Sequence, residues 1–470
     1  MQKEQLSSFQ HIFKEHFPYT PTDGQQNAIE EISGFLFDRT EHALLLLKGY
    51  AGTGKTTLIS AFVQALKALH IRTILLAPTG RAAKVLSSYS AKDAHTIHRY
   101  IYFVFTKPTG GLTIMPRQNK FRDTIFIVDE VSMIPANSDA SAGGFGNRNI
   151  LDDLIRFVYE GENCKMIFIG DDAQLPPVGT TVSPALDKAY LSSAYSLQIK
   201  TLLLNEVVRQ EASSGILSNA TLIREKIAHE QYGPPLLYTG YPDVFGEGGE
   251  EITDALFESF YHSDIKSSVI ITRSNKRANR YNNEIRQRVL YREHEIEGGD
   301  LMMVVKNNYY WLSENTRAGF IANGDLLEIK RIKNIEEQHG FRFADALIQL
   351  TDYPDEPEME VKLLLDTIST ETANLSHEQS MALYHAVKED NPNGVSKDPY
   401  YNALQVKFAY ALTCHKTQGG QWEHVFLDQG WLPEEMMDKA YFRWLYTAVT
   451  RATKKLYLLG FNSNYLEHTK

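Results

Sequence analysis

Short, predominantly apolar runs alternate with segments of helical apolar spacing over the first 200 residues. A short apolar run has the length of a buried strand, and strands that alternate with helices form a parallel sheet. The carboxyl ends of such strands share one edge, where open α/β sheets bind their ligands. Four runs fit and end in polar residues: Ala43–Leu47, Thr73–Ala77, Thr124–Val128 and Lys165–Ile169. The pattern predicts an α/β domain with a site at that edge.

A second α/β unit is predicted in the C-terminal half. Ser267–Thr272 has the pattern of a strand that leads into a polar helix, and three later runs complete the sheet: Lys407–Leu412, Val425–Leu427 and Leu456–Leu459. Between these parts the pattern changes to short β-like runs, such as Leu301–Val305, Leu326–Ile329 and Ala346–Leu350. These runs predict a small β-rich insert at residues 293–400.

A β-hairpin is predicted inside the first unit. The aromatic and β-branched stretch Tyr100–Phe105 is followed by a turn cluster, Lys107–Gly111, and by a second strand pattern, Leu112–Met115. The resulting division of the chain is a first domain at 1–205 with the hairpin at 98–121, a second domain at 206–292 and 401–470, and the insert between the two halves of the second domain.

Charge first argues against a nucleic-acid partner, because the net charge is −10. The stretch Thr351–Tyr400, however, holds 11 Asp and Glu against three Lys. The remaining chain is nearly balanced, so a local basic groove is compatible with the composition. We interpret the acidic stretch as a solvated surface.

Neither a membrane span nor a secretion signal is expected. No apolar run reaches the length of about 18 residues that a spanning helix needs. Met1–Phe17 lacks the apolar centre of a signal peptide. Cys164 and Cys414 lie far apart in sequence, which favours reduced thiols in a cytoplasmic protein over one disulfide.

The strongest chemical signal is Gly49-Tyr-Ala-Gly-Thr-Gly-Lys-Thr56, which fits G-x-x-x-x-G-K-[ST] between a strand and a helix. Its glycines, Gly49, Gly52 and Gly54, let the backbone N–H groups face a phosphate. Lys55 is predicted to reach the β- and γ-phosphates of ATP. Thr56 is predicted to hold Mg²⁺, with Thr57 beside it.

Two later strand ends add candidate catalytic residues. Asp129 and Glu130 close one strand: Asp129 is suited to hold Mg²⁺ and Glu130 to polarise the attacking water. Gln174 follows the next strand, where its amide can bond a phosphate or that water. Arg209 and Arg451 are candidate arginine fingers, and the sequence alone does not separate fingers from structural arginines.

The ordered motifs resemble those of superfamily 1 helicases, within them the RecD-like and Dda-like group that moves 5′→3′. GDDAQLPPVG at 170–179 and AVTRA at 448–452, behind a phosphate loop, are specific together. The resemblance spans most of the chain through Thr22–Gln25, Gly49–Thr57, Ala77–Lys84, Thr96–His98, Ile127–Ser132, Gly170–Gly179, the region around Arg209, Ala411–Gly419 and Trp444–Ala452.

This resemblance implies two RecA-like domains with ATP between them, a hairpin that serves as the duplex-splitting pin, and an SH3-like insert. Gln25 is then the adenine reader, and Gln418 and Gly419 lie near the γ-phosphate. The implied single-stranded DNA contacts are Thr79, Thr96, His98, Thr413 and His415. Trp422 departs from the family pattern, because many relatives have a small residue there.

The implied function is a monomeric, Mg²⁺-dependent ATP hydrolase that translocates 5′→3′ on single-stranded DNA and opens single-strand/duplex junctions, in DNA repair or recombination. An RNA helicase or a non-unwinding translocase stays open, because no motif reads the 2′-hydroxyl decisively. A nucleotide-gated binding subunit is disfavoured by the complete set of catalytic residues. No nuclease constellation is recognisable.

Overall fold

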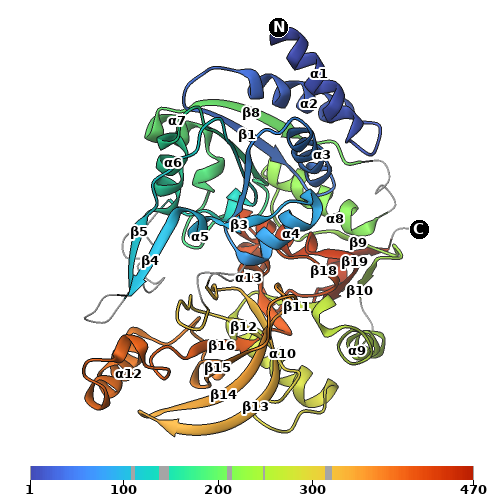
Figure 1. The fold of residues 1–470 in the computed structure, drawn as a ribbon. Helices are drawn as coiled ribbons and strands as arrows, with labels where there is room; N and C mark the ends of the chain where they lie inside the picture. Colours follow the sequence, from blue (N-terminus) through green and yellow to red (C-terminus); the bar gives the residue numbers. More distant parts are fainter. Residues whose placement is uncertain are drawn as a thin grey trace.

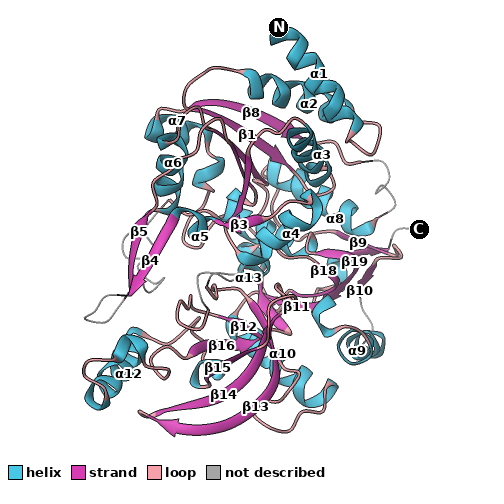
Figure 2. Ribbon diagram, in the orientation of Figure 1, coloured by secondary structure: helices cyan, strands magenta, loops and turns pink. Residues whose placement is uncertain are grey.

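The computed structural model describes residues 2–106, 112–136, 148–208, 214–246, 249–312 and 320–468. Two parallel sheets with flanking helices lie next to each other, and a β-barrel extends from the second sheet (Figures 1 and 2). The predicted fold class, two RecA-like domains with a β-hairpin and a small β-rich insert, is confirmed.

The first sheet has the strand order β3-β2-β6-β7-β1-β8, and all its pairings are parallel. Leu44 to Leu47 of β1 are fully buried, so helices cover both faces of the sheet. The strands are β1 (Ala43–Gly49), β2 (Thr73–Ala77), β3 (Ala94–Thr96), β6 (Ile125–Val128), β7 (Lys165–Gly170) and β8 (Gln198–Leu204). The helices are α1 (Gln2–Glu15), α2 (Asp23–Phe37), α3 (Lys55–Ala68), α4 (Gly80–Ser90), α5 (Ile97–Ile101), α6 (Ile150–Glu160) and α7 (Lys188–Tyr195).

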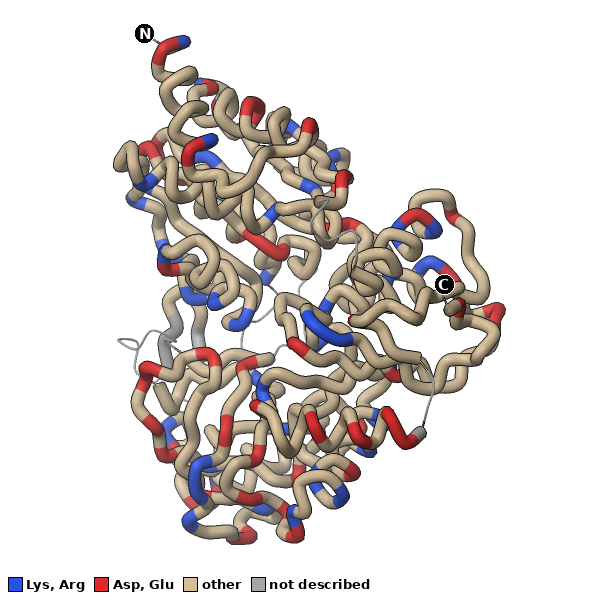
Figure 3. The backbone as a smooth tube through the Cα atoms, turned by 90° about the vertical axis from the view of Figure 1, so that its right-hand side faces the viewer, with Lys and Arg blue, Asp and Glu red and all other residues tan. Residues whose placement is uncertain are grey.

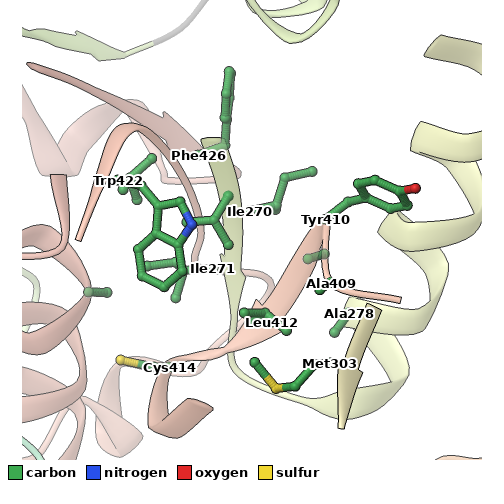
Figure 4. Packing of buried hydrophobic residues seen from close by; sticks show 14 of the residues in the cluster. Ile270, Ile271, Ala278, Met303, Ala409, Tyr410, Leu412, Cys414, Trp422 and Phe426 are labelled. Atoms are coloured by element: carbon green, nitrogen blue, oxygen red, sulfur yellow. The ribbon is translucent and has the colours of Figure 1, made fainter. Parts of the chain in front are cut away.

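The second sheet has the order β10-β19-β18-β11-β17, again in parallel. Figure 4 shows its core, where Ile270 and Ile271 lie near Trp422, Phe426 and Leu412. The strands are β10 (Val244–Gly246), β11 (Ser268–Thr272), β17 (Ala411–Thr413), β18 (Trp422–Asp428) and β19 (Ala452–Leu459); β9 (Leu237–Thr239) pairs with β20 (Leu466–His468). The helices are α8 (Gly215–Ala228), α9 (Gly249–Phe257), α10 (Asn275–Glu284), α13 (Cys414–Thr417) and α14 (Lys439–Val449).

The insert is a closed barrel of five strands, β12 to β16. These are β12 (Leu301–Val304), β13 (Leu326–Gln338), β14 (Phe341–Leu350), β15 (Met359–Leu364) and β16 (Leu404–Phe408), with α11 (Asp366–Ser369) and α12 (His377–Asp390) before the last strand. The prediction of a single strand at Lys407–Leu412 is wrong. The chain breaks it at Ala409 and Tyr410, so that its first part closes the barrel and its second part enters the second sheet.

The barrel is joined to the second domain at one buried polar cluster. Asp300, just before β12, accepts hydrogen bonds from Arg286 Nε and Nη2, each at 3.0 Å. Tyr410, just after β16, donates its hydroxyl to the same carboxylate at 2.8 Å. The entry and exit of the barrel therefore meet at one side chain.

The hairpin forms as predicted, from β4 (Tyr102–Thr106) and β5 (Leu112–Pro116), with Thr106 opposite Leu112. It projects from the first domain in Figure 1. The turn cluster Lys107–Gly111 lies outside the described residues, as do residues 137–147 of the Ser/Gly-rich stretch.

Among the described residues, no helix is both long and apolar enough to cross a membrane. Cys164 and Cys414 are both buried and free, so they form no disulfide.

Candidate nucleotide site and DNA-contact residues

The phosphate loop joins β1 to α3 at the carboxyl edge of the first sheet. Gly52 and Gly54 have φ of 74° and 79°, the left-handed region that glycine adopts without strain. Lys55 Nζ donates hydrogen bonds to the carbonyl oxygens of Gly49 at 2.6 Å and Tyr50 at 2.8 Å. A Cβ on Gly49 would lie 2.8 Å from the Lys55 side chain, so glycine is needed there.

A cavity of about 540 Å³ lies at this loop, and both sheets contribute to it. From the first domain it gathers most of the predicted nucleotide and catalytic residues: Gly52, Gly54, Lys55, Thr56, Thr57, Asp129, Glu130 and Gln174. From the second domain it adds Gly419 and Arg451. Residues as far apart in sequence as Gly52 and Arg451 thus line one site.

Asp129 and Glu130 lie deep in the cavity. Asp129 accepts a hydrogen bond from the Glu130 backbone N–H at 2.8 Å and another from the Tyr89 hydroxyl at 2.6 Å. Burial raises the pKa of Asp129, and burial together with the adjacent Asp129 charge raises the pKa of Glu130 to about 7. Arg451 and Lys55 oppose the second shift. Glu130 therefore has the environment of a base that accepts a proton near neutral pH.

The donor set fits Mg²⁺. The Asp129 carboxylate and the Thr56 hydroxyl line the same cavity, and oxygen donors of this kind are the ones that Mg²⁺ takes beside substrate phosphates. Within the described residues no group of three or more His, Cys, Asp or Glu forms an all-protein cage. A metal here would therefore rely on the nucleotide and water for its other ligands.

Gln174 is buried, and its Oε1 has no hydrogen-bond partner among the described residues. It lines the cavity, so this oxygen is available to a ligand or a water. The next residue, Leu175, is held by the second domain through both of its backbone groups. Its N–H donates to Thr447 Oγ1 at 2.8 Å, and its carbonyl accepts from Gln418 Nε2 at 2.7 Å.

The Tyr446 hydroxyl makes a further bridge between the domains. It accepts from the Ala51 N–H of the phosphate loop at 2.8 Å and donates to Asp171 at 2.7 Å. Asp171 is fully shielded, and burial raises the pKa of its carboxyl group. The first domain's loop and the second domain's α14 are thereby tied at the edge of the cavity.

Arg451 is buried at the cavity wall. Its guanidinium donates to the carbonyls of Thr447 at 2.9 Å and Gly420 at 3.2 Å. These bonds fix a guanidinium close enough to Glu130 to influence its pKa. Arg209, the other predicted finger, lies outside the described residues.

Gln25 is placed against the phosphate loop. Its Oε1 accepts from the Thr22 N–H at 3.0 Å in a capping box at the start of α2, and its Nε2 donates to the Thr53 carbonyl at 3.0 Å. Both ends of the amide are therefore engaged within the protein. Recognition of adenine by Gln25 stays a prediction.

The predicted DNA-contact residues come from both domains. Thr79 caps α4 and Thr96 caps α5 through their hydroxyls, and His98 is partly buried, which lowers its pKa to about 4. Thr413 ends β17 beside Thr272, and His415 is exposed. None of these five residues is among those that line the cavity, and DNA contact by them stays a prediction.

The two domains meet at α4 of the first domain. A Cβ on Gly419 would lie 2.9 Å from that of Ala82, and Gly419 has φ of 73°. Beside it, the Arg81 guanidinium stacks on the Trp422 ring at 3.7 Å, and burial lowers the pKa of Arg81 to about 10. The bulky Trp422 thus fills a place against the first domain.

The barrel also reaches α4. Lys84 Nζ donates to the Thr351 carbonyl at 3.1 Å and lies 3.6 Å from the Asp352 carboxylate. Asp325 is 3% exposed, and a Cβ on Gly80 would lie 2.6 Å from its Oδ1. Lys362, which lies within Thr351–Tyr400, is buried and pairs with Asp345 and Glu336. Most acidic residues of Thr351–Tyr400, among them Asp355, Glu358 and Glu371, are exposed and none is buried, in agreement with the interpretation of this stretch as a solvated surface, and charges of both signs are interspersed along the tube in Figure 3.

Sequence reasoning missed Tyr89, Asp171 and Tyr446. Asp171 stood at a predicted strand end, the same signal that identified Asp129 and Glu130. Tyr446 lies within the segment that resembled a motif, but nothing in its spacing indicated a partner. Tyr89 carries no local signal, because its partner is 40 residues away.

Two parallel sheets that share a cavity lined by a phosphate loop, a carboxylate pair and an arginine define a P-loop nucleoside triphosphatase of two RecA-like domains. Residues 20–232 match the family described as AAA domain, and residues 408–459 match the UvrD-like helicase C-terminal domain. These two matches, together with the relatives described next, support a superfamily 1 helicase of the group of RecD, Pif1 and Dda.

Individual relatives cover different shares of the chain. The ATP-dependent RecD2 DNA helicase of Deinococcus radiodurans is 30% identical over 43% of this chain and 24% of its own length. The ATP-dependent DNA helicase dda of Enterobacteria phage T4 is 27% identical over 60% of both chains. An uncharacterised protein of Acanthamoeba polyphaga mimivirus is 25% identical over 92% of this chain and 98% of its own. Pif1 helicase from Candida albicans aligns over 96% of this chain with 15% identity and a TM-score of 0.45.

Proposed function

We propose that the protein is an ATP-dependent DNA helicase that moves 5′→3′ along single-stranded DNA. The observation that carries the proposal is the cavity that joins the phosphate loop, Asp129, Glu130 and Gln174 to Arg451 of the other domain. A site built from two domains can change its shape when the nucleotide changes. Such a change moves the surfaces on which the strand lies.

The chain's own residues have distinct tasks in this proposal. Lys55 and the loop N–H groups bind and orient the phosphates, while Thr56 and Asp129 hold Mg²⁺, which neutralises developing charge when bound. Glu130 accepts a proton from the attacking water, and Gln174 Oε1 orients that water. Arg451 stabilises the negative charge that spreads over the transferred group.

Contacts between the two domains can transmit a movement from the nucleotide site to the second domain. Gln418 and Thr447 hold the peptide of Leu175, one residue after Gln174, so a shift at the γ-phosphate position reaches the second domain directly. Thr79 and Gly419 lie side by side at the predicted DNA path. A movement between the domains there would shift the two predicted grips on DNA relative to each other.

Unwinding of 5′-tailed and 3′-tailed duplexes, with ATP hydrolysis measured on the same samples, tests activity and polarity together. We expect separation of the 5′-tailed duplex and hydrolysis stimulated by single-stranded DNA. Preference for the 3′ tail would overturn the polarity. Hydrolysis unaffected by any single strand would overturn the helicase proposal. Equal stimulation by single-stranded RNA would show that the protein does not distinguish DNA from RNA.

A further inference from the structure

Helix α4 connects the predicted DNA path with the metal-binding carboxylate. It starts at Thr79 and Gly80, beside Gly419 of the second domain, and ends at Ser90. An uninterrupted helix of 11 residues is about 16 Å long and moves as one body. Tyr89, in its last turn, donates its hydroxyl to Asp129 at 2.6 Å.

The last turn of α4 is also tied to the helix of the phosphate loop. Ser60 Oγ on α3 donates to the Tyr89 carbonyl at 2.6 Å, and Gln64 Nε2 donates to the Ser90 carbonyl at 2.6 Å. Tyr89 lines the nucleotide cavity itself. The backbone at Tyr89 is therefore held by α3, while the Tyr89 hydroxyl orients one oxygen of Asp129.

The other Asp129 oxygen is oriented by the Glu130 N–H. With each oxygen engaged by one donor, rotation of the carboxylate is restricted, and each oxygen keeps a further lone pair for a ligand. Donors of this kind fix the direction of metal ligands, and their loss typically costs about 10- to 100-fold in metal affinity or activity.

We propose that Tyr89 is a positioning residue for Asp129, and that through α4 it makes metal binding respond to DNA at Thr79. This inference rests on the proposed function.

The test is Tyr89→Phe in the full chain, with binding of a fluorescent ADP titrated at a series of Mg²⁺ concentrations, with and without oligo(dT). We expect the wild type to need less Mg²⁺ when DNA is present. Tyr89→Phe should need about tenfold more Mg²⁺ and should respond little to DNA, while its affinity for oligo(dT) stays the same.

Tyr195→Phe is the matched control, since Tyr195 also donates its hydroxyl to an aspartate, Asp152, but on α7 away from the cavity. Ser60→Ala, which releases the Tyr89 carbonyl, should shift the Mg²⁺ requirement in the same direction and gives a second route if Tyr89→Phe fails to fold. An unchanged Mg²⁺ requirement in the variants overturns the positioning role, and an unchanged response to DNA overturns the coupling. Absence of ADP binding in the wild type would instead refute the proposed function.

Discussion

At the scale of single residues, Lys55 has a clear role because its ammonium group already lies inside the phosphate loop. Lys55→Ala removes the charge that would meet the β- and γ-phosphates. We expect ATP hydrolysis to fall at least about 100-fold, the usual cost of losing one charge-stabilising donor, while single-stranded DNA binding persists. Lys67→Ala, an exposed position on the same helix, is the control. Normal hydrolysis by Lys55→Ala would refute the site.

Arg451 is expected to matter for turnover and little for nucleotide affinity. Arg451→Lys keeps a charge but loses the planar fork that bonds the carbonyls of Thr447 and Gly420. We predict a loss on the order of 10³ in kcat, with ADP affinity changed only a few-fold. Steady-state hydrolysis and ADP titration measure both quantities. Arg288→Lys, an exposed arginine in the segment that continues α10, should behave as wild type.

Residue types at strand ends explain why much of this site was predictable. Asp129 and Glu130 follow a buried run, and Gly49 to Thr56 follow another, so local pattern was sufficient. Tyr89 and Tyr446 were not predictable, because a tyrosine in a helix is most often a packing residue. Their roles depend on hydrogen bonds to residues 40 and 275 positions away.

At the scale of elements, the hairpin offers a direct test of strand separation. Thr106 and Leu112 lie opposite each other, so a two-residue Asn-Gly turn can replace residues 107–111 and keep the strands paired. We expect hydrolysis stimulated by single-stranded DNA to stay at the wild-type level and duplex unwinding to fall several-fold. An equal loss of both activities would show that the hairpin does not act specifically in separating the duplex.

The barrel contains a carboxyl group that should make stability depend on pH. Burial, together with the charge of Asp352, raises the pKa of Asp325 from 3.8 to about 7, and only the Ala322 N–H bonds its carboxylate. The folded chain therefore binds a proton that the unfolded chain has released between these values. Stability must fall as the pH rises through this range.

Asp325→Asn keeps an oxygen for the Ala322 N–H and removes the charge. The Tm of the variant should match that of the wild type near pH 4 and exceed it at pH 8. Thermal unfolding followed by circular dichroism at both values measures the difference. A variant that is less stable than the wild type at pH 8 would show that the charged carboxylate is stabilised by its surroundings, which would contradict the prediction.

Predicted and observed elements differ most in the barrel. The core parts of its strands were recognisable, since most residues of Leu326–Ile329 and Ala346–Leu350 are apolar and buried, with Glu328, Leu347 and Gln349 partly buried between them. Beyond these core parts β13 continues to Gln338 with mostly polar residues, and β14 begins at Phe341. The strand structure of both arms comes from their pairing with each other. Strand β16 was merged with β17 because an apolar run does not reveal a change of sheet.

At the scale of the whole molecule, the Tyr446 hydroxyl is one of the buried hydrogen-bonded contacts between the two domains, beside those of Leu175 with Thr447 and Gln418. Tyr446→Phe leaves the Ala51 N–H and the buried Asp171 carboxylate each short of one partner. We predict a loss of about 2 kcal/mol in the free energy of unfolding, measured by urea denaturation. Tyr441→Phe on the same helix should have little effect, because the buried Tyr441 hydroxyl bonds to nothing in the part of the chain that the structure describes. Equal stability of both variants would contradict the bridge.

The junction at Asp300 and Tyr410 has a consequence for how the molecule can be rebuilt. Met302 pairs with Phe408, so the chain leaves the second domain and returns to it at neighbouring points. Insertions of this kind tolerate exchange, because the host only needs its two cut ends to be close together. The barrel is nevertheless no independent attachment, because its apolar residues share one buried cluster with those of the second sheet and Lys84 of α4 bonds the Thr351 carbonyl. A replacement for residues 301–408 therefore has to cover the same apolar surface of the second domain.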